Sequence, residues 1–222
     1  FEMCELKVHV KLPIFVARQW IRHRTANVNE ISARYSILDR EFYIPETEIL
    51  AAQNKDLKQG RSDEPINEEQ ALFVQELLRT DASRAYDNYE ILLNTDSSGE
   101  IIDEDKDGIA RELARMNLSL NFYTQWYWKI DLHNLLGFLA LRTDSHAQYE
   151  IRVYADLLLE VVKLWVPLVY NSFAKYRVGG IGLSAAGKEA IKRMLQGQQV
   201  TREDVGMSAG EWRELLADFE IT

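Results

Sequence analysis

The sequence predicts an α+β protein with a single main domain, in which a mixed or antiparallel sheet is flanked by long helices, plus a C-terminal helical extension. Strand-like and helix-like segments follow one another without the regular alternation of a parallel α/β fold. Apolar residues recur at every second position in the first segment and at helical spacing in several later ones. The 222 residues are 46% hydrophobic and 27% charged, which is typical of a globular chain and argues against disorder.

The first elements follow from local patterns. Residues 4–12 alternate between apolar and polar side chains, with Cys4 on the apolar side, and predict a half-buried strand. Pro13 suits the first turn of a helix, which we place at residues 13–24. Val16 and Trp20, four positions apart, share its buried face. The polar, Asn-rich segment 25–34 predicts a loop.

Later segments are mostly helical. Periodicity predicts strands at 41–44 and 121–130 and helices at 67–94, 109–117, 132–142, 146–166, 184–195 and 208–219. The polar segment 51–65 predicts an excursion on the surface. Residues 178–182 (VGGIG) resemble a linker, so we divide the chain into a main domain at 1–178 and the helical extension at 179–222.

Composition argues against several classes of protein. The net charge of −9 disfavours non-specific nucleic-acid binding, although a local basic cluster can still bind a small anion. A single cysteine excludes an internal disulfide and a multi-cysteine metal site, and favours the reducing cytoplasm. No apolar run reaches the roughly 18 residues of a membrane helix. We expect no signal peptide, and a native segment preceding Phe1.

Two motif-like segments are rejected. Residues 103–108 match the opening of a calcium-binding EF loop, but its twelfth position, which needs a bidentate carboxylate, is Ala114. Residues 182–188 match most of a phosphate-binding loop, but Glu189 follows where Ser or Thr is required. We interpret the first segment as a solvated turn and the second as a helix start capped by Ser184. No metal site is predicted.

The densest cationic cluster is Arg22-His23-Arg24, at the end of the predicted first helix. The helix dipole favours one or two cations there. The following loop adds forked donors, an acceptor and a hydroxyl with few apolar residues, and this inventory suits a phosphate and a planar polar base. A second polar group, at 142–148 (RTDSHAQ), contains more polar side chains than helix capping uses.

These residues resemble a known family. Arg22-His23-Arg24, seven further residues and Ser32 match the signature of flavin-dependent thymidylate synthases. The segments 13–36, 41–45 (EFYIP), 120–136 and 141–150 (LRTDSHAQYE) resemble that family in the same order. About half of the chain is covered. The resemblance implies that domain 1–178 is catalytic.

The resemblance also implies a reaction and its participants. Deoxyuridine monophosphate (dUMP) would be methylated to dTMP, with methylene-tetrahydrofolate as carbon donor and NADPH-reduced FAD as hydride source. The enzyme would be a cytoplasmic homotetramer whose active sites combine several subunits, with no nucleic-acid or membrane partner.

Site residues follow from the resemblance position by position. Contacts to FAD are implied for Arg22, His23, Arg24, Glu30, Asp131, Leu132 and His133. Contacts to the nucleotide are implied for Gln19, Arg22, Glu30, Ile31, Ser32, Ala33, Arg34, Arg115 and Arg142. Two of these would act in catalysis: Arg142 would stabilise the ionised uracil ring, and Ser32 would position or polarise the substrate.

Two alternatives remain open from the sequence. A non-catalytic flavin- or nucleotide-binding paralogue is one, because the family carries a functional histidine just upstream of the position of Phe1. In addition, Gly137 stands where relatives carry a side chain able to touch FAD. The other is a nucleic-acid-binding module that uses the arginines of residues 18–34. The net charge of −9 disfavours this second alternative.

Overall fold

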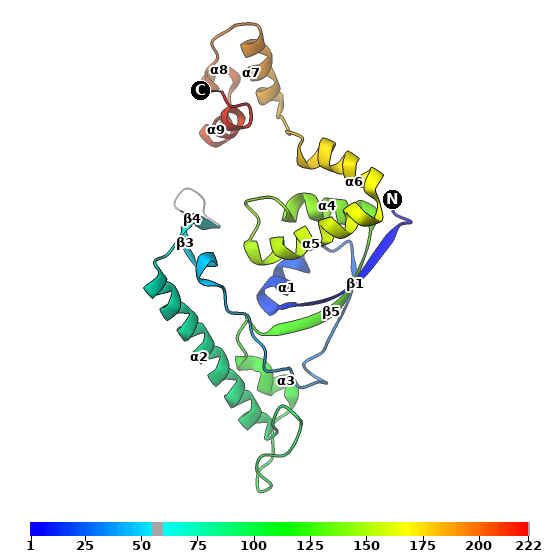
Figure 1. Cartoon of the computed structure of the whole chain (residues 1–222), viewed down its shortest axis with the longest axis vertical. Coiled ribbons are helices and arrows are strands. Elements are labelled where there is room, and N and C mark those ends of the chain that lie inside the picture. Colours follow the sequence, from blue (N-terminus) through cyan, green and yellow to red (C-terminus); the bar gives the residue numbers. More distant parts are fainter. Residues whose placement is uncertain (55–59, 222) are drawn as a thin grey trace. The chain divides into compact units, whose positions relative to one another are not determined.

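The computed structural model describes residues 1–54 and 60–221 (Figure 1). The chain divides into two compact units, Phe1–Val161 and Val162–Thr222. This boundary lies within a helix and earlier in the chain than the boundary that we predicted at residue 178.

The first unit contains two antiparallel sheets and most of the helices. Its elements are β1 (Glu5–Pro13), α1 (Ile14–Trp20), β2 (Asn27–Glu30), η1 (Thr47–Ile49), β3 (Ala51–Gln53), β4 (Arg61–Pro65), α2 (Glu68–Leu93), α3 (Arg111–Ala114), η2 (Arg115–Asn117), β5 (Tyr123–Asp131), α4 (Leu132–Arg142) and α5 (Tyr149–Trp165), which continues into the second unit. The larger sheet has the order β1-β5-β2, and β3 pairs with β4 in a separate hairpin. The predicted α+β class is confirmed.

β5 is the central strand of the larger sheet. On one side Val10 of β1 lies opposite Trp126, and on the other Glu30 of β2 lies opposite the same tryptophan. Because side chains alternate along a strand, the even-numbered residues of β5 point to one face, where they are buried. α1 and α4 cover that face (Figure 1).

Aromatic rings fill the core between this sheet and its helices. Trp20, on α1, stacks on Phe138 of α4 with ring centroids 5.1 Å apart and meets the edge of Trp126 at 5.7 Å. Val16 and Trp20 are both buried, as predicted. A second core lies between α2 and α3, where Tyr86 stacks on Phe122.

Helix α1 is shorter than predicted, and this changes where the cationic cluster lies. It ends at Trp20, and a turn follows in which the backbone N–H of His23 donates to the carbonyl of Trp20 at 3.0 Å. Residues 22–24 therefore lie on a turn. The segment predicted as a loop contains β2, because its pairing with β5 is a long-range contact that local polarity does not reveal.

Two further predictions about the strands were wrong. Cys4 precedes β1 and is exposed. The predicted strand at 41–44 is reduced to one bridge, between Phe42 and Phe122. The predicted excursion at 51–65 carries the β3–β4 hairpin, and its residues 55–59 lie outside the described residues.

Asn94 organises the acidic link that follows α2. It adopts the left-handed conformation with φ 54°, which Asn tolerates at a helix C-terminus. Its Nδ2 donates to the carbonyls of Asp103 and Lys106 at 2.7 and 2.6 Å, and its Oδ1 accepts from the N–H of Asp103. The rejected calcium segment is therefore a turn fastened to a helix end. In the described part of the chain, no group of three or more His, Cys, Asp or Glu is placed to hold a metal ion.

We expect Gly108→Ala to destabilise the first unit. A Cβ at this position would lie 1.9 Å from the carbonyl oxygen of Leu93, so backbone must shift. The free energy of unfolding should fall by about 1–3 kcal/mol, which urea denaturation measures. Gly137→Ala is the matched control, since its Cβ would meet no described atom within 4 Å and alanine favours a helix. Equal unfolding midpoints for the two variants would contradict the expectation.

The second unit is helical. It contains α6 (Pro167–Phe173), the π-helical turn η3 (Ala174–Val178), α7 (Ala185–Leu195), α8 (Arg202–Val205) and α9 (Ala209–Asp218). Ala190, Met207 and Leu215 form its small core. The Oγ of Ser184 accepts from the N–H of Gly187 at 3.0 Å, which confirms the predicted cap of α7. Within the described residues, no helix has the length and apolar character to cross a membrane.

Candidate active site

His23 and Arg142 meet although 119 positions separate them in the sequence. Arg142 is the last residue of α4, and its Nε donates to Nε2 of His23 at 3.0 Å. The rings of His23 and Phe138 pack edge to face, with centroids 4.8 Å apart. The fold therefore joins the turn after α1 to the end of α4.

The protonation state of His23 follows from this contact. Because Nε2 accepts a hydrogen bond, the ring is neutral and carries its proton on Nδ1. Burial and the positive charge of Arg142 lower the pKa of His23, and burial lowers the pKa of Arg142 as well. Among the residues that the structure describes, the two Nη groups of Arg142 have no hydrogen-bond or ion-pair partner.

The loop after β2 forms a tight turn around Ser32. The carbonyl of Ser32 accepts from the N–H groups of Tyr35 and Ser36, both at 3.0 Å, and its Oγ accepts from the N–H of Arg34 at 3.3 Å. Upstream, the N–H of Ile31 donates to the carbonyl of Gln125 at 2.9 Å, so the loop is tied to the central strand. Ser32 and Ala33 are half-buried.

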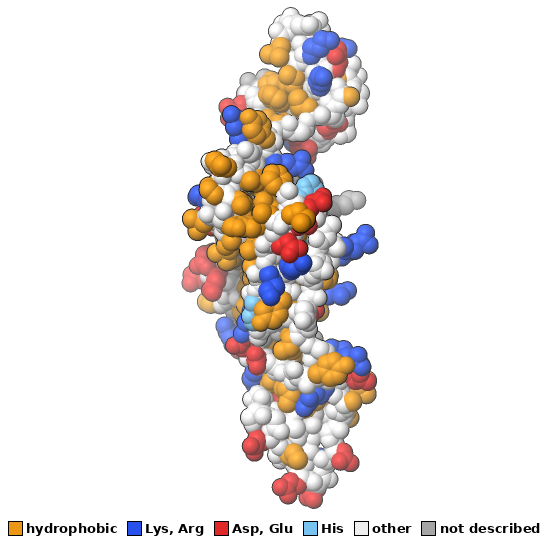
Figure 2. Space-filling model, turned by 90° about the vertical axis from the view of Figure 1, so that its right-hand side faces the viewer, with side chains coloured by type: hydrophobic (Ala, Val, Ile, Leu, Met, Phe, Trp, Pro, Cys, Tyr) orange, Lys and Arg blue, Asp and Glu red, His pale blue; other side chains and the backbone are white. Residues whose placement is uncertain are grey.

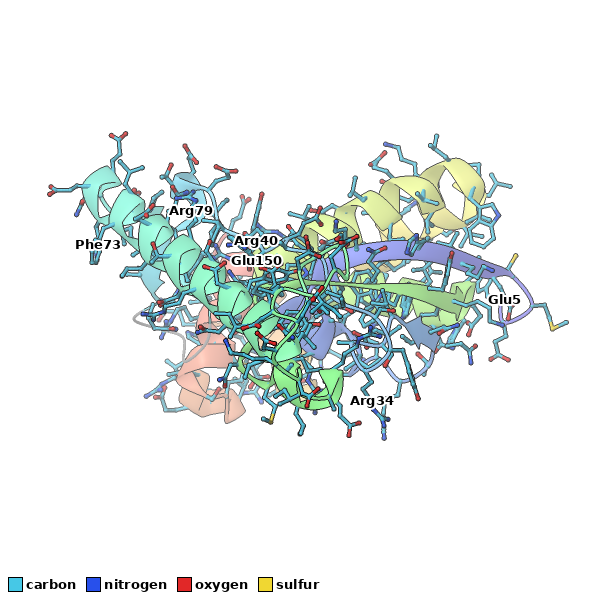
Figure 3. All side chains as sticks on the ribbon, turned by 90° about the horizontal axis from the view of Figure 1, so that it is seen from below. Glu5, Arg34, Arg40, Phe73, Arg79 and Glu150 are labelled. Carbon is cyan, nitrogen blue, oxygen red and sulfur yellow. The ribbon has the colours of Figure 1, made fainter. Side chains whose placement is uncertain are left out.

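Arg34 extends from this turn to α3. Its Nε and Nη2 both lie 3.1 Å from Oε2 of Glu112, and its side chain points away from the ribbon (Figure 3). Arg111 donates from Nη1 to the carbonyl of Tyr35 at 2.7 Å. Arg115, which directly follows α3, is half-buried. The structure therefore brings α3 against the predicted nucleotide loop.

Glu30 and Gln19 present acceptors on the side of the sheet that α1 covers. Oε1 of Glu30 accepts from the hydroxyl of Thr124 at 2.7 Å. Oε1 of Gln19 is buried and has no hydrogen-bond partner among the described residues. A buried acceptor without a donor is unusual, and an N–H of a bound ring would satisfy it.

The predicted FAD segment opens α4. Asp131 is its N-cap and accepts from the N–H and Nδ2 of Asn134 at 2.9 and 2.6 Å. Burial raises the pKa of Asp131, but the hydrogen bonds from Asn134 outweigh it and hold the pKa below its ordinary value. Leu132 is buried in the core and His133 is exposed. The Leu132 side chain therefore faces the protein interior, which leaves Asp131 and His133 on the accessible side.

The predicted site forms two clusters within one chain. The first is His23 with Arg142, and the second is the Ser32–Arg34 turn with α3. Within residues 1–54 and 60–221, no hydrogen bond or ion pair joins them. Arg22 and Arg24 are exposed, and in the same described part their guanidinium groups have no hydrogen-bond or ion-pair partner.

Sequence reasoning missed Glu112 and Arg111. Glutamate and arginine are ordinary residues on a short surface helix. Both lie within about one helical turn of Arg115, and this spacing was the one signal for them in the sequence. Their contacts with Arg34 and Tyr35 span 78 and 76 positions, so local pattern contains no signal for them.

Comparison with solved structures places this fold beside a nucleotide methylase. The chain resembles the UMP/dUMP methylase PolB from Streptomyces cacaoi bound with 5-Br dUMP, with a TM-score of 0.66 and 28% identity over 78% of this chain and 72% of that one. PolB bound with 5-Br UMP gives the same TM-score at 26% identity. Fold and site thus define an α+β protein of this methylase class.

The family follows from sequence relatives. The family model described as thymidylate synthase complementing protein matches residues 1–168. The flavin-dependent thymidylate synthase of Rickettsia conorii is 58% identical over 219 residues, which are 99% of this chain and 74% of that protein. The enzyme of the same name from Ruegeria pomeroyi is 59% identical over 96% of this chain and 68% of its own length. The chain belongs to this family, and the resemblance seen in the sequence is confirmed.

Proposed function

We propose that the chain catalyses the reductive methylation of dUMP to dTMP, with methylene-tetrahydrofolate as carbon donor and NADPH-reduced FAD as hydride source. The observation that carries the proposal is the contact between His23 and Arg142, in a chain whose relatives are named flavin-dependent thymidylate synthases. A half-buried guanidinium whose Nη groups have no hydrogen-bond or ion-pair partner among the described residues suits the stabilisation of an anionic ring.

Recognition of dUMP is assigned to both clusters. The phosphate carries nearly two negative charges at neutral pH, which suits the forked guanidinium groups of Arg34 and Arg115. Gln19 offers its unpartnered Oε1 to a ring N–H. The Ser32 turn would enclose the nucleotide through backbone N–H groups and its hydroxyl. The bound 5-Br dUMP of PolB supports a nucleotide of this kind.

The residues present fit FAD. Arg22 and Arg24 expose guanidinium groups to which the described residues offer no acceptor, and such groups suit a pyrophosphate. His23, Glu30, Asp131 and His133 add donors and acceptors, whereas Leu132 can offer only its backbone because its side chain is buried. When bound, FAD supplies the redox chemistry, and the protein supplies binding, orientation and electrostatics.

Arg142 performs the electrostatic step. Placed beside the pyrimidine, its Nη groups stabilise the negative charge that develops on the ring and thereby activate the ring carbon. His23 holds Nε, so the guanidinium is oriented before the substrate arrives. No enzyme nucleophile is required for this step.

Active sites shared between subunits of a homotetramer would account for the two separate clusters. α5 also exposes apolar residues at helical spacing, with Val153, Leu157 and Val161 exposed by 38, 64 and 41%. Figure 2 shows hydrophobic side chains gathered on one side of the molecule. Apolar patches of this kind are typical of surfaces that contact another chain. The single cysteine supports the cytoplasm as the compartment.

The first test is the visible absorbance spectrum of the purified protein, taken before and after anaerobic addition of NADPH with dUMP present. We expect flavin bands that bleach. Release of tritium from dUMP labelled at the methylated carbon then reports the transfer step. A colourless protein that takes up no added FAD would contradict the proposal, and binding of FAD and dUMP without tritium release would instead indicate a non-catalytic paralogue.

We expect Ser32→Ala to lower kcat/KM for dUMP about fivefold, the effect of one ordinary hydrogen bond. The substitution removes the hydroxyl that accepts from Arg34 N–H and that would meet the substrate. Tritium release measures the change. Ser36→Ala is the matched control, because the Ser36 hydroxyl makes no hydrogen bond within the described residues. Kinetics identical to the wild type would contradict a role for the Ser32 hydroxyl in the nucleotide site.

A further inference from the structure

A buried ion pair lies outside the site described above. Arg61 of β4 donates from Nη2 to both carboxylate oxygens of Glu150, at 2.9 and 2.8 Å. The Glu150 side chain, in the first turn of α5, is only 8% exposed and lies within the body of the molecule (Figure 3). Tyr43 adds a longer hydrogen bond from its hydroxyl, at 3.4 Å. A carboxylate this buried needs such partners, because burial of an unpaired charge is strongly unfavourable.

Arg61 also fastens its own hairpin. Its Nη1 donates to the carbonyl of Ile49 at 2.5 Å, just before β3. The hairpin β3–β4 is separate from the larger sheet, and an isolated two-stranded hairpin is marginally stable in water. One guanidinium therefore connects the hairpin to the start of α5.

The contacts continue from Arg61 toward Arg142. The guanidinium groups of Arg61 and Arg152 lie 5.6 and 5.9 Å from the ring centroid of Tyr149. Arg152 also donates from Nη1 to the carbonyl of Ser145 at 2.8 Å. Ser145 belongs to the turn 143–148, which directly follows Arg142. A chain of packed contacts thus leads from the hairpin, through the first turn of α5, to the turn beside Arg142.

We propose that Arg61 is a positioning residue of the active site. Through Glu150 and Tyr149 it fixes the start of α5 and the turn 143–148, and thereby the end of α4 that carries Arg142. This inference rests on the proposed function. Displacement of a catalytic group by about 1 Å can cost a hundredfold in rate, so a contact remote from the substrate can control turnover.

A variant that separates positioning from stability tests the proposal. Well-packed apolar residues often replace a buried ion pair without loss of stability, whereas removal of one partner is destabilising. The double variant Arg61→Met with Glu150→Leu should therefore unfold near the wild-type temperature. We expect its kcat for tritium release to stay about ten- to a hundredfold low, and its dUMP affinity, from calorimetry on the FAD-loaded protein, to change much less.

A second variant keeps the test decisive if the double variant does not fold. Arg61→Lys retains the charge but loses the fork and the stacking plane. We expect Arg61→Lys to lower kcat at assay temperatures well below the melting temperature of the variant, where the protein is still folded. Arg79→Lys is the matched control, because Arg79 forms an exposed ion pair with Glu76 on α2.

The outcomes distinguish the two proposals. Wild-type kcat in the folded double variant, or in folded Arg61→Lys, would overturn the positioning role and make the ion pair structural only. Failure of the proposed function shows differently, as a wild-type protein that binds no FAD or releases no tritium from labelled dUMP. A low kcat in the variants beside an active wild type and an active Arg79→Lys supports the positioning role.

Discussion

Replacement of Arg142 by alanine is expected to lower kcat about a hundredfold or more while the chain still folds and binds FAD. The variant removes the charge that stabilises the anionic pyrimidine. It leaves Nε2 of His23 without its donor, which costs stability only on the scale of one hydrogen bond, about 1 kcal/mol. Tritium release from labelled dUMP measures the rate. Circular dichroism and the flavin spectrum report the fold and the cofactor.

Arg84→Ala is the matched control for this experiment. Arg84 pairs with Asp81 on the exposed surface of α2, so its removal deletes a guanidinium remote from both clusters. Its activity should equal that of the wild type. If Arg142→Ala instead unfolds or loses FAD, Arg142 has a structural role. If the variant folds and keeps its activity, Arg142 does not stabilise the anionic ring.

Stability is expected to decline as the pH falls below the ordinary pKa of histidine, 6.5, because of His23, and activity is expected to follow at lower pH, where the folded protein itself takes up the proton. Burial and the charge of Arg142 lower the pKa of His23, so the folded state takes up its proton at a lower pH than the unfolded state does. The unfolded state then binds more protons in this range. The stabilising contribution is therefore complete above pH 6.5 and is lost as the pH falls through the lowered pKa.

The variant His23→Gln separates this titration from other causes. A glutamine side chain offers an oxygen that can accept from Nε of Arg142 but does not titrate. We expect a lower maximal rate and a flatter acid limb in the pH profile of kcat, with the same flattening in the urea midpoint. An acid limb that matches the wild type in position and steepness would show that another group titrates.

The sequence predicted the elements that are marked by short-range patterns, such as helix caps and helical periodicity. The helix at 132–142 matches α4 at both ends, and 67–94 matches α2 to within one residue, because Asp131 and Asn67 cap them and apolar residues recur at helical spacing. The strand β2 and the end of α1 were missed, since they depend on pairing with β5 and on packing. Such contacts join distant segments and leave no trace in a short window.

For the site as well, the sequence named individual residues, whereas contacts between distant residues became visible only in the fold. The resemblance nominated Arg142 and His23 together, yet only the fold shows that one donates to the other. Leu132 was nominated with its neighbours, but the alternation at the end of β5 turns its side chain into the core. Arg61 received no role, because a polar segment reads as an ordinary surface excursion until its partner Glu150 is known.

The unequal positions of β5 and β2 have a consequence for the exchange of backbone amide hydrogens with solvent. β5 is paired on both sides, so its amides should exchange among the slowest in the first unit, whereas β2 has one open edge. Since β2 leads directly into the Ser32 turn, a nucleotide bound there should slow exchange in residues 27–36 and leave β5 nearly unchanged. Deuterium uptake of that one peptide would then report occupancy of the nucleotide site without any label on the substrate.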